Sequence, residues 1–351
     1  MSDTYFDWLA SNTPTRWWHD SGSPPEIELA KQRGALGVTT NPVLTYRTFC
    51  NEPDFWREKV ASIPPDLDFE ARAEALLQLV AVYAADQFRD VFLKTQGRHG
   101  LALGQLNPGL AGNAAGMLSQ ARRIHSWGSN IAIKLPATRS GITVVEQLAA
   151  EGIPICATLN VSVAQALAVA KAYESGALRA EKAGIKPALC LVVQQVGRLD
   201  DYLRDVASDM QADISENDII HSGLAVAKRT YSLFKEKGYR SVIMPAGLRG
   251  PYHVTEMAGA AVTFSITTRV QDMVLAAEPL RESGIDRPVD EAIIRRLKQI
   301  PEFVRAYEPD GLKPADFITY GVIQKLLSQF TETGWAPLET YNSDKQSGRW
   351  I

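Results

Sequence analysis

Residues 130–136 read Asn-Ile-Ala-Ile-Lys-Leu-Pro and alternate between two faces with a period of two. Ile131, Ile133 and Leu135 share one face, and Lys134 falls on the other. This pattern predicts a strand whose aliphatic face packs under helices, with the Lys134 side chain pointing into the interior of a sheet or barrel. Burial disfavours the charged form of lysine, and a neutral amine can attack a carbonyl carbon to form a Schiff base. A lysine at a sheet edge that extends to solvent is the alternative that this segment leaves open.

Seven further apolar, β-rich segments occur along the chain, and helix-like segments lie between them. The eight predicted strands are Arg16–Asp20, Leu36–Thr40, Gly100–Leu106, Asn130–Pro136, Pro154–Leu159, Ala188–Val196, Ser241–Ala246 and Ala261–Ile266. The predicted helices are 24–33, 69–91, 114–126, 142–150, 162–174 and 218–237, most of them ended by a glycine. Eight alternating βα units predict an α/β fold, a (β/α)₈ TIM barrel over residues 1–270, with a doubly wound open sheet as the alternative. Residues 271–351 are predicted to form a helical extension packed on the barrel.

The composition indicates an ordinary soluble globular protein, with 45% hydrophobic and 22% charged residues among 351. The formal net charge of −3 does not provide the positive field that attracts nucleic acid, so we expect no nucleic-acid partner. The expected partners are small molecules or other subunits, and the protein could form a homodimer. Cys50, Cys156 and Cys190 are far apart, which argues against a zinc site and fits a reducing compartment. No signal peptide and no uncharged run of about 18 residues is recognised, so we expect no membrane association and a cytoplasmic location.

Polar side chains are predicted at the carboxyl ends of the strands, where (β/α)₈ barrels carry their chemistry. A lysine among aspartate, threonine, asparagine and glutamine, with two arginines beyond, suits a carbonyl compound that carries an anionic group such as phosphate. The polar residues expected at this end are Asp20, Thr39, Thr40, Asn41, Gln105, Asn107, Lys134, Thr158, Asn160, Gln194, Gln195, Arg198 and Arg249.

The order of motifs resembles the transaldolase family. Residues 37–42 (GVTTNP) look like the TTNP segment of its second strand, and residues 131–138 (IAIKLPAT) look like its Schiff-base lysine motif. Residues 152–166 resemble the next unit, residues 196–198 resemble the VGR motif, and residues 246–249 (AGLR) resemble the ASFR segment. These motifs fall in the family's order between residues 16 and 270. The resemblance implies a (β/α)₈ barrel with the lysine on the fourth strand.

The resemblance also implies roles for the catalytic residues. It assigns Lys134 as the amine that forms the Schiff base with a ketose, and Asp20 as a proton donor or acceptor near the substrate hydroxyls. It assigns Thr158 as the residue that positions the catalytic water, with Gln105 beside it. From the residues alone, Asp20 could instead cap the helix that begins near Pro24, and Thr158 could be an ordinary strand threonine.

Substrate-binding residues follow from the same comparison. Asn41 and Thr40 match the TTNP segment, although an asparagine before proline could also be a turn residue. Arg198 and Arg249 match a phosphate-binding pair, although each could be a solvated surface charge. Cys156 and Gln195 are also expected to line the substrate site. The resemblance implies no cofactor and no metal, because the iminium itself accepts the electrons of the broken bond.

Several positions depart from the family pattern. Gln105 stands where transaldolases have a glutamate, and glutamine cannot accept a proton at neutral pH. A glutamine there also resembles the fructose-6-phosphate aldolase branch, which pairs it with a tyrosine where this chain has Gln195. Cys156 replaces an asparagine, and Val193 and Gly247 replace hydroxyl side chains.

We therefore expect transaldolase-type transfer of a three-carbon dihydroxyacetone unit between sugar phosphates through a lysine Schiff base. The alternatives are a Schiff-base aldolase or condensing enzyme with an unusual substrate, and a sugar-phosphate-binding protein with reduced activity.

Overall fold

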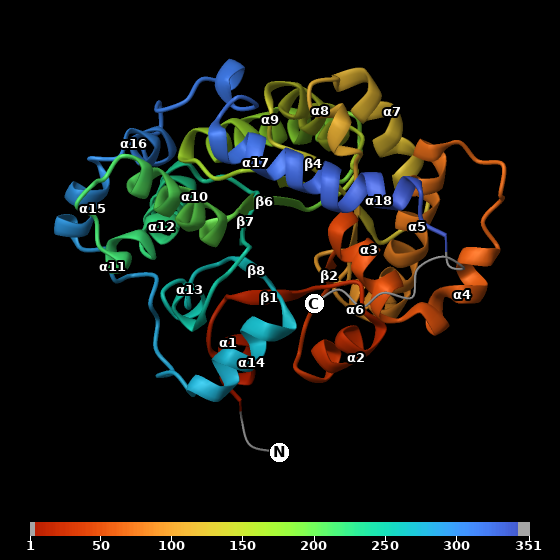
Figure 1. Cartoon of the computed structure of the whole chain (residues 1–351), viewed down its shortest axis with the longest axis horizontal. Coiled ribbons are helices and arrows are strands. Elements are labelled where there is room, and N and C mark those ends of the chain that lie inside the picture. The colour runs from red at the N-terminus through yellow and green to blue at the C-terminus, as the bar shows by residue number, and fades with distance from the viewer. Residues whose placement is uncertain (1–3, 343–351) are drawn as a thin grey trace.

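A computed structural model of the chain describes residues 4–342 and shows eight strands that alternate with helices (Figure 1). The strands are β1 (Arg16–Asp20), β2 (Val38–Thr39), β3 (Ala102–Gln105), β4 (Ile131–Pro136), β5 (Ile155–Thr158), β6 (Cys190–Gln194), β7 (Val242–Pro245) and β8 (Thr263–Ile266). They pair in parallel in the order β7-β6-β5-β4-β3-β2-β1-β8, and β7 also contacts β8. The sheet therefore curls round on itself, and the prediction of a (β/α)₈ TIM barrel is confirmed.

Helices surround the barrel and continue beyond the last strand. Those up to β6 are α1 (Tyr5–Asn12), α2 (Pro24–Gln32), α3 (Pro42–Asn51), α4 (Pro53–Ala61), α5 (Phe69–Gln87), α6 (Arg89–Lys94), α7 (Ala114–His125), α8 (Arg139–Ala150) and α9 (Val163–Lys182). The later ones are α10 (Val196–Asp209), α11 (Glu216–Ile219), α12 (Ser222–Lys237), α13 (Pro251–Thr255), α14 (Thr268–Ala277), α15 (Glu291–Leu297), α16 (Pro301–Tyr307), α17 (Gly321–Phe330) and α18 (Ala336–Glu339). Short 3₁₀ turns at Pro108–Leu110 and Pro314–Asp316 and a π turn at Thr331–Trp335 complete the described elements.

Three predicted helices differ in the structure: the one at 69–91 is divided into α5 and α6, and the other two differ for identifiable reasons. α9 continues past the predicted stop at Gly176. The glycine does not end the helix; it leaves room for α8 to approach closely. A Cβ at Gly176 would lie 2.2 Å from the Glu146 carbonyl oxygen. The helix predicted at 218–237 is divided into α11 and α12. Asp218 closes a capping box with Ser215 at the start of α11, so its side chain stabilises a separate short helix.

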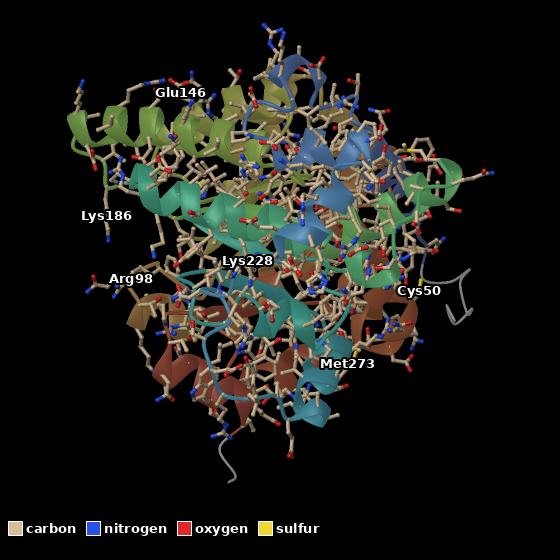
Figure 2. The ribbon with its side chains drawn as sticks, turned by 90° about the vertical axis from the view of Figure 1, so that its left-hand side faces the viewer. Cys50, Arg98, Glu146, Lys186, Lys228 and Met273 are labelled. Carbon is tan, nitrogen blue, oxygen red and sulfur yellow. The ribbon has the colours of Figure 1, made fainter. Side chains whose placement is uncertain are left out.

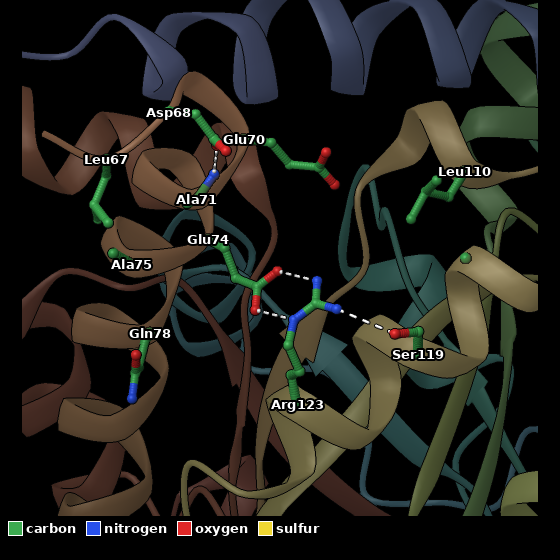
Figure 3. A pocket seen from close by; sticks show the side chains of 11 residues that line it. Leu67, Asp68, Glu70, Ala71, Glu74, Ala75, Gln78, Leu110, Ser119 and Arg123 are labelled. Atoms are coloured by element: carbon green, nitrogen blue, oxygen red, sulfur yellow. Dashed lines mark hydrogen bonds and ion pairs between the residues drawn. The ribbon is translucent and has the colours of Figure 1, made fainter.

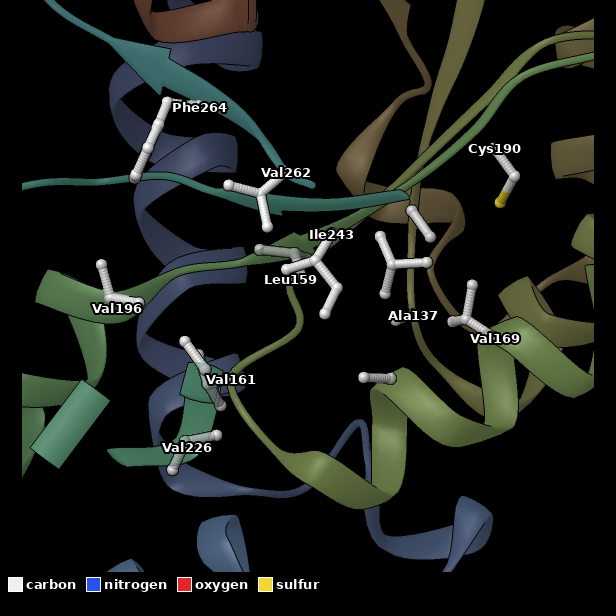
Figure 4. Close-up of a cluster of buried hydrophobic side chains, with 14 of the residues drawn as sticks. Ala137, Leu159, Val161, Val169, Cys190, Val196, Val226, Ile243, Val262 and Phe264 are labelled. Atoms are coloured by element: carbon white, nitrogen blue, oxygen red, sulfur yellow. The ribbon is translucent and has the colours of Figure 1, made fainter. Parts of the chain in front are cut away.

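The alternation of β4 separates two apolar layers. Ile131, Ile133 and Leu135 belong to the outer core beneath the helices, and Ala132 belongs to a smaller core inside the barrel. Figure 4 shows part of the outer core, where side chains of β7 and β8 meet those of α9 and α12. The inner core consists of Trp18, Leu101, Leu103, Ala132, Cys156, Leu191, Val193 and Met244. Because this inner core fills the middle of the barrel, polar groups can gather only at its ends.

The chain beyond α14 returns across the carboxyl ends of the strands. The segment from α17 to α18 runs over the barrel towards α3 and α5 (Figure 1). A Cβ at Gly334 would lie 2.8 Å from the backbone nitrogen of Val43, so the π turn packs directly on the first turn of α3. The division at residue 270 into barrel and extension stays a prediction, and its last residues, 343–351, lie outside the described part. Within residues 4–342, no helix combines the length and apolar character needed to cross a membrane.

Candidate active site

Lys134 faces the inside of the barrel from a central strand. Its side chain is only 7% exposed, in contrast to Arg98 and Lys186, which lie at the outer surface (Figure 2). β4 pairs with β3 on one side and β5 on the other, so Lys134 is not at a sheet edge. Its Nζ donates a hydrogen bond to the carbonyl oxygen of Thr40 at 3.0 Å. The prediction of an enclosed lysine is therefore confirmed.

A cavity of about 170 Å³ lies beside Lys134 at the carboxyl ends of the strands. Its lining includes every residue that was assigned a catalytic or substrate-binding role except Thr40 and Gln105, while Asn107, Asn160 and Gln194, also expected at this end, do not line it. The predicted residues that line it are Asp20, Asn41, Lys134, Cys156, Thr158, Gln195, Arg198 and Arg249. It shares Asp20, Leu44, Arg47, Leu248, Arg249 and Thr267 with an outer chamber of about 520 Å³. The narrow cavity therefore has a wider entrance on the side of β1 and β8.

Asp20 is held in place by hydroxyl groups. The Thr39 hydroxyl donates to Asp20 Oδ1 at 2.7 Å and lies 2.6 Å from the Ser265 hydroxyl. The N-cap of α2 is Ser23, so Asp20 does not cap that helix. Asp20 supplies the one carboxylate among the described residues of the cavity lining, which makes it the lining group best able to take a proton from a substrate hydroxyl.

Thr158 and Gln195 form a hydrogen-bonded pair on the opposite wall. Gln195 Nε2 donates to Thr158 Oγ1 at 3.2 Å, while Gln195 Oε1 finds no partner among residues 4–342. Asn41 caps α3, because its Oδ1 accepts from the Leu44 backbone N–H at 2.9 Å. Its amide N–H groups make no hydrogen bond within residues 4–342, so the turn role and a binding role are compatible.

Thr40 and Gln105 lie next to the site without lining the cavity. The Thr40 hydroxyl donates to the Leu103 carbonyl, and its own carbonyl accepts from Lys134. Gln105 pairs with Lys134 in the register of β3 and β4 and is 4% exposed. Its Oε1 has no hydrogen-bond partner within the described chain. A buried unpaired oxygen costs about 1–3 kcal/mol, which is typical of a functional site and not of a structural core.

The two predicted arginines have different surroundings. Arg249 binds Asp201 through Nε and Nη2, and its Nη1 donates to the Gly247 carbonyl at 2.9 Å. Burial raises the pKa of Asp201, but the bonds and charges of Arg249 and Arg204 outweigh it and keep that pKa below its ordinary value. Burial lowers the pKa of Arg198, and the charge of Arg249 lowers it further. Arg249 is thus paired directly with a carboxylate, whereas Asp201 and Asp20 act on Arg198 only through their charges.

A buried network supports Arg249 from behind. Asp200 accepts hydrogen bonds from the Ser222 hydroxyl and the Gly223 N–H, both at 2.8 Å, and lies 3.0 Å from His253 Nε2. The backbone N–H of Arg249 in turn donates to His253 Nδ1 at 3.0 Å. Asp200 therefore fixes the loop after β7, while its neighbour Asp201 binds the arginine side chain.

The floor of the cavity is apolar. Leu103, Cys156, Val193 and Met244 line it, and all four belong to the inner core. Burial raises the pKa of the Cys156 thiol to about 12, although the charge of Lys134 opposes this effect. Cys156 therefore stays a neutral thiol, and the floor offers few groups that could bind a hydroxyl.

Several lining residues were not predicted from the sequence. Ser265 lies on β8, where alternation with apolar neighbours is a usable signal, whereas Thr39 was among the polar residues expected at this end. The others, which come from a helix after β2 and from the end of α17, carry no such local signal: Arg47, Gln329 and Phe330.

A larger hollow of about 530 Å³ on the outside of the barrel is a weaker candidate (Figure 3). It lies between α5 and α7, and its lining shares no residue with the cavity beside Lys134. Its one basic side chain is already paired, since Arg123 binds Glu74 through two bonds of 3.2 and 3.0 Å and also contacts Ser119. The remaining charged groups of the lining, Asp68 and Glu70, are acidic, and Asp68 caps α5. Size alone therefore does not mark the functional site.

Comparison with known proteins agrees with this site. A family model described as transaldolase/fructose-6-phosphate aldolase matches residues 17–313, a range that includes every predicted site residue. A probable transaldolase of Dehalococcoides mccartyi is 32% identical over 269 residues, which cover 76% of this chain and 93% of that protein. A probable transaldolase of Heliobacterium modesticaldum is 28% identical over 273 residues, covering 78% of this chain and 94% of that protein. A transaldolase of Neisseria gonorrhoeae is 30% identical over 208 residues, covering 59% of this chain and 58% of that protein.

Proposed function

Because the chain belongs to the transaldolase/fructose-6-phosphate aldolase family, we propose that it transfers a three-carbon dihydroxyacetone unit between sugar phosphates through a Schiff base on Lys134. Family membership makes the chain a transaldolase-type enzyme, as predicted, and favours a transferase over a binding protein with reduced activity. The observation that carries the proposal is the enclosure of Lys134 in one cavity with Asp20. A buried amine and a carboxylate on facing walls are the two groups that a Schiff-base aldol reaction needs.

The reaction begins when the Lys134 amine adds to the ketose carbonyl and expels water, which leaves an iminium. Asp20 then takes the proton of the C4 hydroxyl as the C3–C4 bond breaks, and the electron pair of that bond moves onto the nitrogen as an enamine. The aldehyde leaves. The enamine attacks an acceptor aldehyde, Asp20 returns its proton to the new hydroxyl, and water releases the product ketose from Lys134.

The remaining wall residues suit binding more than proton transfer. Gln105 and Gln195 can donate and accept hydrogen bonds but do not titrate near neutral pH. Thr158, paired with Gln195, is proposed to position the water that hydrolyses the iminium. We propose that Asn41, Thr40 and Cys156 contact or shape the bound ketose. Asp20 is then the principal group for proton transfer in this cavity.

A product assay tests the transfer. The enzyme is incubated with fructose 6-phosphate, with and without a four-carbon aldose phosphate as acceptor, and the products are identified by chromatography and mass spectrometry. We expect a new seven-carbon ketose phosphate that depends on the acceptor and is absent with Lys134→Met. Thermal stabilisation by fructose 6-phosphate without any turnover would contradict the proposal and support a binding protein instead.

A Schiff-base aldolase or condensing enzyme with an unusual donor is the second candidate, and the apolar floor favours it. If Asp20 acts at C4, the C1 end of the donor points away from Asp20, towards Cys156 and Val193. A hydroxyl buried there without a partner would cost about 1–3 kcal/mol. This candidate predicts that hydroxyacetone is a better donor than dihydroxyacetone, and that free three-carbon ketone appears without an acceptor. Equal use of both donors, with release only when an acceptor is present, would contradict it.

We also propose a cytoplasmic location and keep a homodimer as a proposal. The cysteines of the described chain are free, which suits a reducing compartment. Cell fractionation would test the location, and light scattering of the purified enzyme would test the oligomeric state.

A further inference from the structure

Ser265 brings a hydroxyl group to the cavity from β8. Its neighbours along the strand, Phe264 and Ile266, belong to the outer core, so strand alternation turns Ser265 inward. The register between β8 and β1 places Ser265 beside Trp18, which belongs to the inner core. The Ser265 side chain lines the cavity and is only 4% exposed. A hydroxyl buried to this degree needs a hydrogen-bond partner, and Thr39 supplies it.

The contacts of Thr39 decide which way the hydroxyl protons point. Thr39 Oγ1 lies 2.7 Å from Asp20 Oδ1 and 2.6 Å from Ser265 Oγ. The His19 carbonyl oxygen is further away, at 3.3 Å. Thr39 has one hydroxyl proton, and the ionised carboxylate is the strongest of these acceptors and has no proton to donate. Thr39 therefore donates to Asp20, and the contact of 2.6 Å requires Ser265 to donate to Thr39.

This chain of hydroxyl groups leaves one oxygen of Asp20 for the substrate. Oδ1 is occupied by Thr39, whereas Oδ2 makes no hydrogen bond within residues 4–342. A hydroxyl that accepts a hydrogen bond is polarised and becomes a stronger donor, so Ser265 strengthens the bond from Thr39 to Oδ1. Without Ser265, the Thr39 hydroxyl would be freer to rotate towards the His19 carbonyl, and the carboxylate would lose its fixed orientation.

We propose that Ser265 is a positioning residue for proton transfer, which acts through Thr39 to hold the Asp20 carboxylate with Oδ2 turned towards the C4 hydroxyl of the ketose. This inference rests on the proposed function, in which Asp20 takes and returns the C4 proton. No proton moves along the chain of hydroxyls, since Ser265 and Thr39 keep theirs while Oδ2 gains a proton and gives it up. Loss of Ser265 therefore slows the steps that need the base and spares the addition of Lys134 to the carbonyl.

The test compares Ser265→Ala, Thr39→Val and the double variant with the wild type. The matched control is Ser241→Ala, because Ser241 is also a buried serine, precedes β7 and does not line the cavity. The first readout is kcat for transfer from fructose 6-phosphate to a four-carbon aldose phosphate. The second is the concentration of dihydroxyacetone that gives half-maximal borohydride-trapped adduct on Lys134.

We expect Ser265→Ala to lower kcat roughly 10-fold and Thr39→Val, which removes the direct donor to the carboxylate, up to roughly 100-fold. The half-saturating concentration of dihydroxyacetone should stay unchanged, and Ser241→Ala should match the wild type in both readouts. Ser265→Ala should change kcat less than about 2-fold once Thr39 is valine, because Ser265 acts through Thr39. An unchanged kcat in Ser265→Ala would overturn the inference. So would a full 10-fold loss in the Thr39→Val background, or trapping that weakens by the same factor as kcat.

Urea unfolding provides a measurement that does not depend on Schiff-base chemistry. Ser265→Ala should lower the folding equilibrium constant roughly 5-fold in the wild type and less than about 2-fold in Thr39→Val, where the partner of Ser265 is already lost. Equal losses in both backgrounds would contradict the bond from Ser265 to Thr39. If the wild type forms no adduct and transfers nothing, the proposed function fails, while the unfolding cycle still decides whether this bond exists. Full transfer by Ser265→Ala beside an active wild type would overturn the positioning role alone.

Discussion

Protonation of His19 is expected to destabilise the end of β1 as the pH falls below neutrality. His19 lies on the outer face of β1, fully buried, and its Nδ1 lies 3.0 Å from Gln271 Nε2. That amide nitrogen also donates to the Ile266 carbonyl at 3.0 Å, which joins the ends of β1 and β8. The other ring nitrogen lies 4.0 Å from Glu26. A proton on Nδ1 would face the Gln271 N–H group, so the charged ring would lose this hydrogen bond.

The magnitude follows from the pKa. Burial lowers the pKa of His19 from its ordinary value of 6.5 to about 4. The unfolded chain therefore takes up a proton near pH 6.5 that the folded protein does not take up until about pH 4. Since the unfolded state binds more protons in this window, stability is full above pH 6.5 and is lost as the pH falls towards 4. The loss in unfolding free energy from His19 is about 2 kcal/mol at pH 5 and about 3 kcal/mol at pH 4.

Urea unfolding of the wild type and of His19→Asn at pH 7.5 and pH 5 measures this effect. Asparagine keeps an acceptor near the Nδ1 position but does not titrate. The wild type should therefore lose about 2 kcal/mol more than the variant between the two pH values. Burial also lowers the pKa of His99 to about 4, so His99→Asn should remove a second, additive contribution. Parallel pH dependence in the wild type and His19→Asn would refute this reasoning.

Three further variants test the site and the helix α17 that packs over it. Asp20→Asn should lower kcat for transfer roughly 10²–10⁴-fold while the adduct on Lys134 still forms, because the general base is lost and the amine is kept; an unchanged kcat would contradict the role of Asp20. Gln105→Glu should raise the initial transfer rate less than about tenfold, because this side chain does not line the cavity, and a gain near 10²-fold would show that a carboxylate there takes part. Phe330→Ala should lower the unfolding free energy by roughly 3–5 kcal/mol in urea, because a ring that is 6% exposed is removed. A Phe330→Ala variant as stable as the wild type would contradict the packing of α17 over the cavity.

The inward orientation of Lys134 could be predicted because strand alternation is a local property. Ile131, Ile133 and Leu135 needed an apolar layer, and that requirement alone turned Lys134 to the other face. The inward orientation of Asp20, Thr158 and Cys156 could be predicted in the same way. Each of them ends or lies within a strand whose outward residues are buried under helices. The barrel then brought these strand ends together.

Which of Thr39 and Thr40 faces the cavity depends on the register between β1 and β2. Both residues stand at the end of β2, and the sequence does not say which of them faces the cavity. β1 pairs Asp20 with Thr39, so Thr39 shares the inward face and Thr40 turns outward to the Leu103 carbonyl. A strand of two residues has too little alternation of its own to predict this.

Arg47 and Phe330 could not have been predicted from local pattern. Arg47 is one charged residue on an otherwise ordinary helix, and Phe330 ends a helix far along the chain from the strands it covers. Their place at the cavity results from the packing of α17 and the π turn against α3. The ion pair between Arg249 and Asp201 could not be predicted from sequence either, because the adjacent Asp200 is an equally plausible partner in the sequence.

Borohydride reduction in the presence of dihydroxyacetone tests the central claim most directly. Peptide mass spectrometry should find one reduced three-carbon adduct, located on Lys134, in the wild type, and none in Lys134→Met. An adduct on a different lysine, or no adduct on Lys134 under conditions of measurable turnover, would contradict the assignment of this buried amine as the nucleophile.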